Sequence, residues 1–343
     1  MKLLRNLLKW MGIILGSILL LLAMAGISYR IFGPILQEPR GKMVDVGGFS
    51  LHIQSEGKRR GRPTLVVETG GGLAGEHYHW LYEGLKDSMR VVRYDRAGIG
   101  YSDSSPNPRD PETIAYELHT LLKNAGETPP YILAGHSIGG PYISVFAQLY
   151  PEEVEALVFL DNTHPDRVER MDLPTPSSFI FRSMVLGYEG LAVLGDLGLV
   201  GLYERLFGPI IPMEGLPEEV EQRAAEFLLD GKLIRTYAKE LALYHSTLQR
   251  ASQASDFGSL PLLIFGSGKE MSEGAKEHYR KRGIDPHERG MAEVKLKEDI
   301  LSWSTDSKLM FIDGDHNSMY TLKANADLIC DEILALLRRL PKE

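Results

Sequence analysis

The sequence predicts an α/β fold in which helices cover both faces of a mostly parallel β-sheet. Three observations lead to this prediction. Short apolar runs bounded by turn residues alternate with helical stretches over most of the 343 residues, as expected for buried parallel strands and their crossover helices. Between residues 160 and 260 the alternation stops, and apolar residues recur at helical spacing. A long apolar segment near the N-terminus adds a membrane-spanning helix.

The apolar segment covers residues 10–29 and contains no charged residue. At a rise of about 1.5 Å per residue it spans about 30 Å, the thickness of the hydrocarbon layer of a bilayer. Trp10 and Tyr29 bracket it, and three basic residues precede it: Lys2, Arg5 and Lys9. This pattern predicts a single-pass anchor in the cell membrane, with residues 1–9 in the cytoplasm and the folded body outside it.

A cleaved signal peptide is the alternative for the same segment. Ala23-Met24-Ala25 has the small-x-small pattern of a cleavage site, and it follows an apolar run of suitable length. The mature protein would then be secreted. Both alternatives place the body beyond the cytoplasmic membrane, and the mass of the mature chain distinguishes them.

The predicted α/β core has two parts, residues 43–163 and 259–340. A hairpin around Gly47-Gly48 opens it, with strands at 43–46 and 49–54. Six buried strands follow at 64–68, 89–94, 131–134, 154–160, 260–265 and 308–312. Helices separate them at 76–86, 111–124, 138–150, 275–282 and 322–340. Right-handed crossovers of this kind build a parallel sheet covered on both sides.

Residues 164–258 are predicted to form a helical cap over the carboxyl edge of the sheet. Apolar residues recur at three- and four-residue spacing in 178–186, 191–206, 218–229 and 234–245. Glycines and prolines separate these stretches. Residues 164–258 are therefore predicted to be an insertion between two strands of the core.

Composition excludes several classes of protein. A formal charge of −8 and a pI near 5.8 do not fit a nucleic-acid-binding surface, which needs a concentrated basic face. With a single cysteine, neither a disulfide framework nor a cysteine-based zinc site is available. Its neighbours repeat at helical spacing, so Cys330 is expected to pack inside a helix.

The chemistry centres on Gly135-His136-Ser137-Ile138-Gly139, placed directly after one predicted strand and before one predicted helix. This is the context that a G-x-S-x-G nucleophile elbow requires, because the glycines permit a tight turn that lifts the serine hydroxyl clear of the sheet. The pattern predicts Ser137 as a nucleophile.

A second motif, Tyr94-Asp95-Arg96-Ala97-Gly98-Ile99-Gly100-Tyr101-Ser102, is similar to the D-R-x-G-x-G-x-S segment of the α/β-hydrolase family. With the elbow it makes residues 43–340 resemble that family. The resemblance implies an eight-stranded, mostly parallel sheet with a helical cap, and a triad in the order serine, acid, histidine. We expect Asp95 and Arg96 to be structural, fixing the loop beneath the site by a charge-assisted pair.

The family places its base in the loop after the last strand, where this sequence has Asp313-Gly314-Asp315-His316-Asn317. His316 is therefore the expected base, which takes the proton of the serine. Two carboxylates are candidates for the acid. Asp161 follows the sixth strand, as in some relatives, and Glu270 follows the seventh, where most members have their acid.

The oxyanion hole is expected from two backbone amides, those of Ile138 and Gly71. The serine mechanism calls for no metal or cofactor, and none is predicted. Substrate-binding residues are not identified, although three histidines near the predicted loops are candidates for lining the pocket: His77, His79 and His164.

Together these features predict a membrane-anchored serine hydrolase that cleaves a small-molecule carboxylic ester or acyl substrate through an acyl-enzyme. Two alternatives stay open. A proline-iminopeptidase-like aminopeptidase would use cap carboxylates for the substrate amine, here Glu218, Glu219 and Glu221. A non-catalytic hydrolase-fold binding module would not react with a fluorophosphonate.

Overall fold

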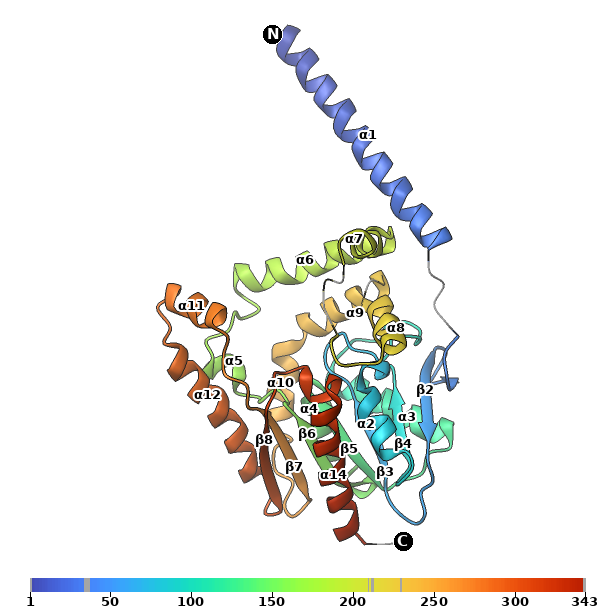
Figure 1. Cartoon of the computed structure of the whole chain (residues 1–343), viewed down its shortest axis with the longest axis vertical. Helices are drawn as coiled ribbons and strands as arrows, with labels where there is room; N and C mark the ends of the chain where they lie inside the picture. The colour runs from blue at the N-terminus through green and yellow to red at the C-terminus, as the bar shows by residue number, and fades with distance from the viewer. Residues whose placement is uncertain (1, 34–37, 209, 211–212, 229, 342–343) are drawn as a thin grey trace.

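The structure is a computed structural model that describes residues 2–33, 38–208, 210, 213–228 and 230–341. Within these residues eight strands form one sheet in the order β1-β2-β4-β3-β5-β6-β7-β8 (Figure 1). The pairs β1–β2 and β2–β4 are antiparallel and the others are parallel, which confirms the predicted sheet. The strands are β1 (Lys42–Asp45), β2 (Ser50–Glu56), β3 (Thr64–Glu68), β4 (Val91–Tyr94), β5 (Tyr131–His136), β6 (Val154–Leu160), β7 (Leu262–Ser267) and β8 (Ser307–Ile312).

Helices cover both faces of the sheet because successive strand residues point to opposite sides. Leu65 and Val67 pack in one core, with α2 (His79–Leu85) and α14 (Lys323–Arg339). Val66 packs in the other core, with α3 (Pro111–Ala125) and α4 (Gly139–Leu149). Buried side chains thus fill both interfaces, as in other doubly covered parallel sheets.

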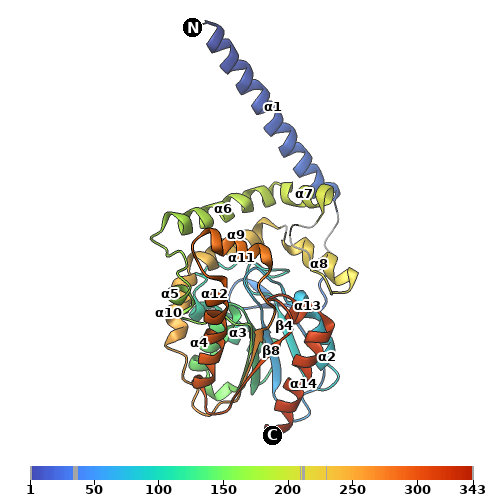
Figure 2. The same ribbon diagram turned by 60° about the vertical axis from the view of Figure 1, so that its left-hand side comes forward.

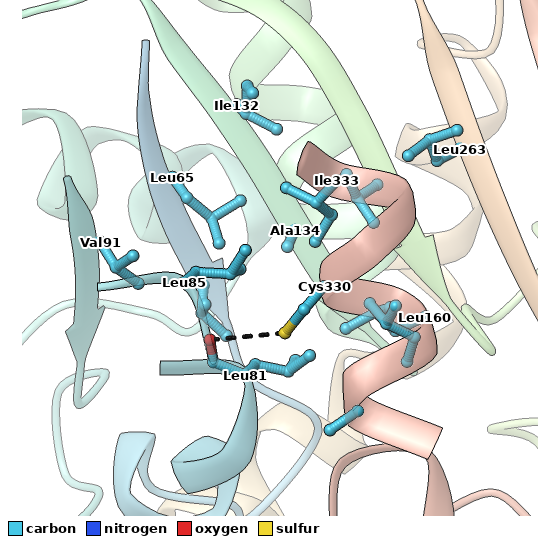
Figure 3. Close-up of a cluster of buried hydrophobic side chains, with 14 of the residues drawn as sticks. Leu65, Leu81, Leu85, Val91, Ile132, Ala134, Leu160, Leu263, Cys330 and Ile333 are labelled. Carbon is cyan, nitrogen blue, oxygen red and sulfur yellow. Dashed lines mark hydrogen bonds between the residues drawn. The ribbon is translucent and has the colours of Figure 1, made fainter. Parts of the chain in front are cut away.

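Figure 3 shows part of the first core, where Cys330 of α14 faces Leu81 and Leu85 of α2. The thiol lies 3.9 Å from the carbonyl oxygen of Leu81, and the residue is only 4% exposed. Cys330 therefore packs inside a helix, as its neighbours in the sequence predicted.

The chain between β7 and β8 forms two α-helices, α11 (Glu273–Lys281) and α12 (Pro286–Asp299), where the sequence predicted one at 275–282. The second helix begins at an N-cap, Asp285, whose carboxylate accepts from the amide of His287. The Asp-Pro pair is a helix-start signal that the prediction overlooked. Short helices complete the core: η1 (Gly75–Tyr78), η2 (Pro151–Glu153), η3 (Ile300–Trp303) and α13 (Ser318–Thr321).

In the described part of the chain between β6 and β7 there are six helices: α5 (Arg167–Arg170), α6 (Phe179–Asp196), α7 (Leu199–Phe207), α8 (Glu218–Leu228), α9 (Gly231–Ala242) and α10 (Tyr244–Ser252). We call α5–α10 the cap helices. Figures 1 and 2 show α6, α7 and α9 across one end of the body, with the sheet beneath them. Whether the insertion is a separate unit with the bounds 164–258 stays a prediction.

The predicted break between helices at 186 and 191 is wrong, because α6 runs on to Asp196. Gly187 and Gly190 lie within it, and a Cβ on either would meet nothing within 4 Å, so these glycines sit on an open helix surface. The break comes instead at Gly198, whose φ of 76° is left-handed, and there α6 and α7 meet at 82°.

Helix α1 (Lys2–Phe32) extends away from the body (Figure 1). Its mean hydropathy of 2.3 over the most apolar window, only 6% of it buried, makes it long and apolar enough to cross a membrane, by length and composition. Its C-terminal end contacts α7, beside which it leaves the body (Figure 2).

Candidate active site

Ser137 sits in a strained turn between β5 and α4. Its φ of 55° is in the left-handed region, which is uncommon for a residue with a side chain. The turn is held on both sides, since the Ser137 amide donates to Leu160 O at 3.1 Å and its carbonyl accepts from Thr163 N at 2.9 Å. Both partners lie at the end of β6, so the neighbouring strand fixes the elbow.

Two glycines of the motif are required by close packing. A Cβ on Gly135 would lie 2.6 Å from the carbonyl oxygen of Gly139, and a Cβ on Gly139 would lie 2.6 Å from that of Glu68. Neither distance is possible for real atoms, so the turn is closed to larger residues at both positions. This is the physical basis of the G-x-S-x-G pattern here.

Asp161 and His316 are joined by a hydrogen bond. His316 Nδ1 lies 2.6 Å from Asp161 Oδ2, although the two residues are 155 positions apart in the sequence. Glu270, the other candidate acid, is 92% exposed and lies 3.7 Å from Lys276. Within the described residues, His316 therefore contacts Asp161 and makes no ion pair with Glu270.

Lys297 of α12 lies under the carboxylate of Asp161, with Nζ 3.0 Å from Oδ1. Burial raises the pKa of Asp161, but the charge of Lys297 and the hydrogen bond from His316 outweigh burial and hold that pKa well below its ordinary value. Asp161 is therefore a carboxylate throughout the neutral pH range. Lys297 was not among the predicted site residues, because no helix was predicted where α12 lies.

His136, inside the elbow, connects three loops of the site. Its Nε2 lies 3.1 Å from the carbonyl oxygen of His316, which can only accept, so Nε2 carries a proton. Burial holds the pKa of His136 well below its ordinary value, so the ring is neutral and Nδ1 accepts from the Tyr78 hydroxyl at 2.8 Å. That hydroxyl accepts in turn from Gly70 N at 2.9 Å. The His316 loop and the Gly70 loop are thus held to one buried ring.

The expected oxyanion donors lie side by side. A Cβ on Gly71 would be 3.7 Å from Ile138 Cγ2, so the two backbone segments are neighbours across the elbow. In the described ranges, neither amide donates to a protein acceptor. Two unpaired amides next to a serine leave donors available for a bound oxygen atom.

Arg96 ties the Gly70 loop to the cap helices. It is 1% exposed and donates to Thr69 O at 2.6 Å and to Gly70 O at 2.9 Å. Its charge is paired with Glu68 of β3 and Glu240 of α9, at 2.6 and 3.0 Å. The expected pair between Asp95 and Arg96 is wrong.

Asp95 instead contacts His52 Nδ1 at 2.9 Å and accepts from Gly75 N at 2.8 Å. The physical reason is direction, because adjacent residues in an extended segment point to opposite sides of the chain.

A cavity of about 1590 Å³ lies between the sheet edge and the cap helices, larger than the about 300–1,000 Å³ of usual ligand pockets. Its lining is mainly apolar and includes all of the predicted site residues, among them Glu270: Gly71, Ser137, Ile138, Asp161, Glu270 and His316.

The three histidines expected to line this cavity, His77, His79 and His164, are not among its lining residues, whereas His245 and His287 are. His77 and His164 are instead packed in the interior, where burial lowers the pKa of each to about 4. The glutamates of the aminopeptidase alternative also lie outside the lining: Glu218, Glu219 and Glu221.

Across the residues with described positions, no group of three or more His, Cys, Asp or Glu side chains is arranged to hold a metal ion. Polar groups around Ser137 are protein donors and acceptors: a carboxylate, an imidazole and backbone amides. This set is suited to proton transfer and to binding an anionic oxygen.

The nucleophile elbow, the strand order and the polar residues at the carboxyl edge of the sheet are those of an α/β-hydrolase fold. The comparisons with known proteins agree with this class. The chain belongs to the α/β-hydrolase fold family, whose model matches residues 63–295.

Among curated proteins it is similar to the uncharacterised protein YbdG of Bacillus subtilis (strain 168), 32% identical over 201 residues, which are 57% of this chain and 60% of that protein. The chain spans less than two thirds of the length of the first curated relatives it matches.

Two solved structures show the same fold at low identity. The enol-lactonase from Burkholderia xenovorans LB400 is 16% identical, with a TM-score of 0.60 over 87% of this chain and 100% of that one. A thermophilic esterase from Thermogutta terrifontis is 20% identical, with a TM-score of 0.55 over 88% of this chain and 99% of that one. At such identities the likeness extends to the fold alone.

Proposed function

We propose that this protein is a serine hydrolase that cleaves carboxylic esters through an acyl-enzyme. The observation that carries the proposal is the 2.6 Å hydrogen bond between Asp161 and His316, in the same cavity as Ser137. A carboxylate on Nδ1 fixes the imidazole tautomer whose Nε2 is free to accept a proton. A serine, a base and an orienting acid on one cavity wall are the minimum set for acyl transfer.

In the first half-reaction, His316 Nε2 takes the proton of Ser137 as its Oγ attacks the ester carbonyl carbon. The carbonyl oxygen becomes an oxyanion, which accepts from the Gly71 and Ile138 amides. His316 then returns its proton to the alkoxy group as the C–O bond breaks. The alcohol leaves, and the acyl group stays on Ser137 as an ester.

In the second half-reaction, His316 takes a proton from water, which attacks the acyl carbon. The same two amides receive the oxyanion, and the proton passes back to Ser137 as the acid leaves. Throughout both steps Asp161 remains ionised, in keeping with its lowered pKa, and stabilises the imidazolium.

An ester with an acyl chain fits this cavity better than an aminoacyl amide does. The wall formed by the cap helices is mainly apolar, with Met184, Tyr188 and Leu191 from α6. The glutamates of the aminopeptidase alternative lie outside the lining, and Glu219 is paired with Arg223 and Arg40. A substrate amine would therefore lack the carboxylates that this alternative assigns to it.

The proposal also places the enzyme at the cell membrane, anchored by α1 with its body outside the cytoplasm. Support comes from the exposed apolar surface of α1 and from the basic residues at its start, which favour the cytoplasmic side. A mature chain with the mass of the full sequence is expected. A mass reduced by a peptide ending near Ala25 would establish secretion instead.

The test of the chemistry is replacement of the nucleophile. Purified Ser137→Ala should lose turnover of an activated short-chain ester and labelling by a fluorophosphonate, while its unfolding curve stays close to that of the parent. Ser144→Ala is a matched control, because Ser144 is buried in α4 and donates to Gly140 O. Undiminished turnover by Ser137→Ala would overturn the mechanism.

A further inference from the structure

We infer that the outer face of α6 and α7 lies in the surface of the lipid bilayer, so that the cavity draws its acyl substrate from the membrane. The outer face is defined by five apolar side chains, which are between 53% and 84% exposed: Phe179, Leu186, Val193, Leu206 and Phe207. The substrate part of this inference rests on the proposed ester hydrolase. The contact with the bilayer does not depend on it.

The first argument is the density of exposed apolar groups. Large apolar side chains on the surface of a water-soluble protein are normally scattered, and a contiguous patch marks a contact surface. On the core such residues are isolated, as Leu149 at the end of α4 and Leu301 in η3 are. On α6 and α7 they follow one another along two joined helices.

The second argument is the place where α1 joins the body. A Cβ on Gly26 would lie 2.2 Å from the carbonyl oxygen of Leu197, at the junction of α6 and α7, and a Cβ on Gly201 would lie 2.5 Å from the ring of Tyr29. Gly26 and Tyr29 both belong to the uncharged stretch 10–29. The contact with the cap helices is therefore made by the end of the membrane-spanning segment, at the depth of the bilayer surface.

The direction of the helices agrees with this placement. Figure 2 shows α1 rising from the end of the α6–α7 pair, while α6 runs sideways across the top of the body. A membrane crossed by α1 therefore passes along α6. Arg30, just beyond the apolar stretch, donates to the carbonyl oxygen of Asp196 and fixes the junction.

The pair α6–α7 lies on the bilayer and does not cross it. The two helices meet at 82°, and the inner side of α6 is packed, with Phe181 and Ala192 buried. The outward face of α6 carries Leu186 and Val193 beside the exposed charges of Arg182 and Glu189, and such a mixture of apolar and charged groups is typical of an interfacial helix. Arg182 and Arg205 are exposed on α6 and α7, where they can contact lipid phosphates.

The same helix forms the wall of the cavity. Met184, Tyr188 and Leu191 of α6 line it, while Leu186 points outward and is 68% exposed. One layer of helix thus separates the bilayer from the space above Ser137. An acyl chain can pass from lipid to cavity along this layer with little exposure to water, which favours membrane-resident esters of long chains.

Fluorescence quenching tests the contact directly. The full chain with Cys330→Ala is reconstituted in phosphatidylcholine vesicles, and an environment-sensitive dye is attached at Leu186→Cys or Phe207→Cys. Leu149→Cys is the matched control, because Leu149 is apolar and 42% exposed. It lies at the C-terminal end of α4, away from the cap helices. Brominated phosphatidylcholine should quench the first two labels at least about threefold more than the control. Equal quenching at all three positions would overturn the bilayer contact.

Hydrolysis in vesicles tests the path of the substrate. Leu186→Glu should lower the turnover of a long-chain ester embedded in phosphatidylcholine vesicles by about fivefold or more, relative to that of a soluble short-chain ester. Leu149→Glu should leave this ratio unchanged. A ratio unchanged by Leu186→Glu would contradict the membrane path. If the parent chain hydrolyses neither ester, the proposed function fails, while the quenching result still decides whether the outer face contacts lipid.

Discussion

The two walls of the cavity are built in different ways. The core wall, with Ser137 and Asp161, is held by hydrogen bonds and ion pairs that are almost entirely buried. The wall made by α6 is apolar on its inner side and carries exposed apolar groups on its outer side. This difference separates two tasks. Proton transfer needs fixed distances, whereas an acyl chain needs an apolar space of suitable shape.

The largest effect is expected from a substitution in the core wall at Asp161, the proposed triad acid. Asp161→Asn should lower kcat by about 10⁴-fold, because an amide favours the wrong imidazole tautomer. Glu270→Gln, at a position 92% exposed, should leave kcat unchanged. Steady-state kinetics on a soluble ester compare the two. A large loss in Glu270→Gln together with an active Asp161→Asn would reverse the assignment.

The next effect concerns the buried charges between the walls. Arg96→Met leaves Glu68 and Glu240 buried without their cation, so it should lower the free energy of unfolding by about 3–5 kcal/mol. Arg205→Met removes an exposed cation of α7 and should change the free energy of unfolding by no more than about 0.5 kcal/mol. Urea unfolding of the two variants measures the contrast. Similar losses in both would show that the buried ion pairs of Arg96 contribute no more to stability than an exposed cation does.

A pH effect of intermediate size arises from His77, which is fully buried in the core. Burial lowers its pKa to about 4 in the folded protein, so between pH 6.5 and 4 only the unfolded chain binds this proton. Stability should therefore fall as the pH drops through this window, by about 1.4 kcal/mol per pH unit for this group.

Thermal unfolding of His77→Gln across the same pH window should show a shallower dependence than the parent. His164, whose pKa is also about 4, still contributes in this variant, so the dependence does not vanish. An unchanged slope would mean that His77 is not neutral in the folded state.

The smallest effect is expected on the outer face of α6. Leu186→Glu should change the free energy of unfolding by no more than about 0.5 kcal/mol, because the side chain is 68% exposed and packs little. Denaturant unfolding in detergent measures this change in the free energy of unfolding. A loss comparable to that of Arg96→Met would show that this face is part of the packed core.

The sequence predicted the sheet, the elbow and the position of His316, because each depends on local signals. A strand, a glycine turn and a helix follow one another around Ser137, and a loop follows the last strand at His316. The choice of acid was not local. Asp161 and Glu270 each follow a parallel strand, so both lie at the same sheet edge, and the hydrogen bond between His316 and Asp161 distinguishes them.

Contacts between distant segments were beyond the sequence patterns. Lys297 and Asp161 are far apart in the chain, as are Arg96 and Glu240. Local patterns in a single sequence do not indicate which distant residues form such pairs. The predicted helix limits in the cap were wrong for another reason. Gly187 was interpreted as a break, although glycine on an open helix surface costs only about 1 kcal/mol relative to alanine.

The bond between Arg96 and Glu240 limits how the fold can be recombined. Arg96 belongs to the core and Glu240 to α9, so a chimera that exchanges the whole insertion must bring its own carboxylate to this point or leave the buried Nε of Arg96 without its partner, although Glu68 still balances the charge. Exchange of α6 and α7 alone leaves this bond intact. If the proposed ester hydrolysis holds, new acyl specificities are best grafted at these two helices, with α9 retained.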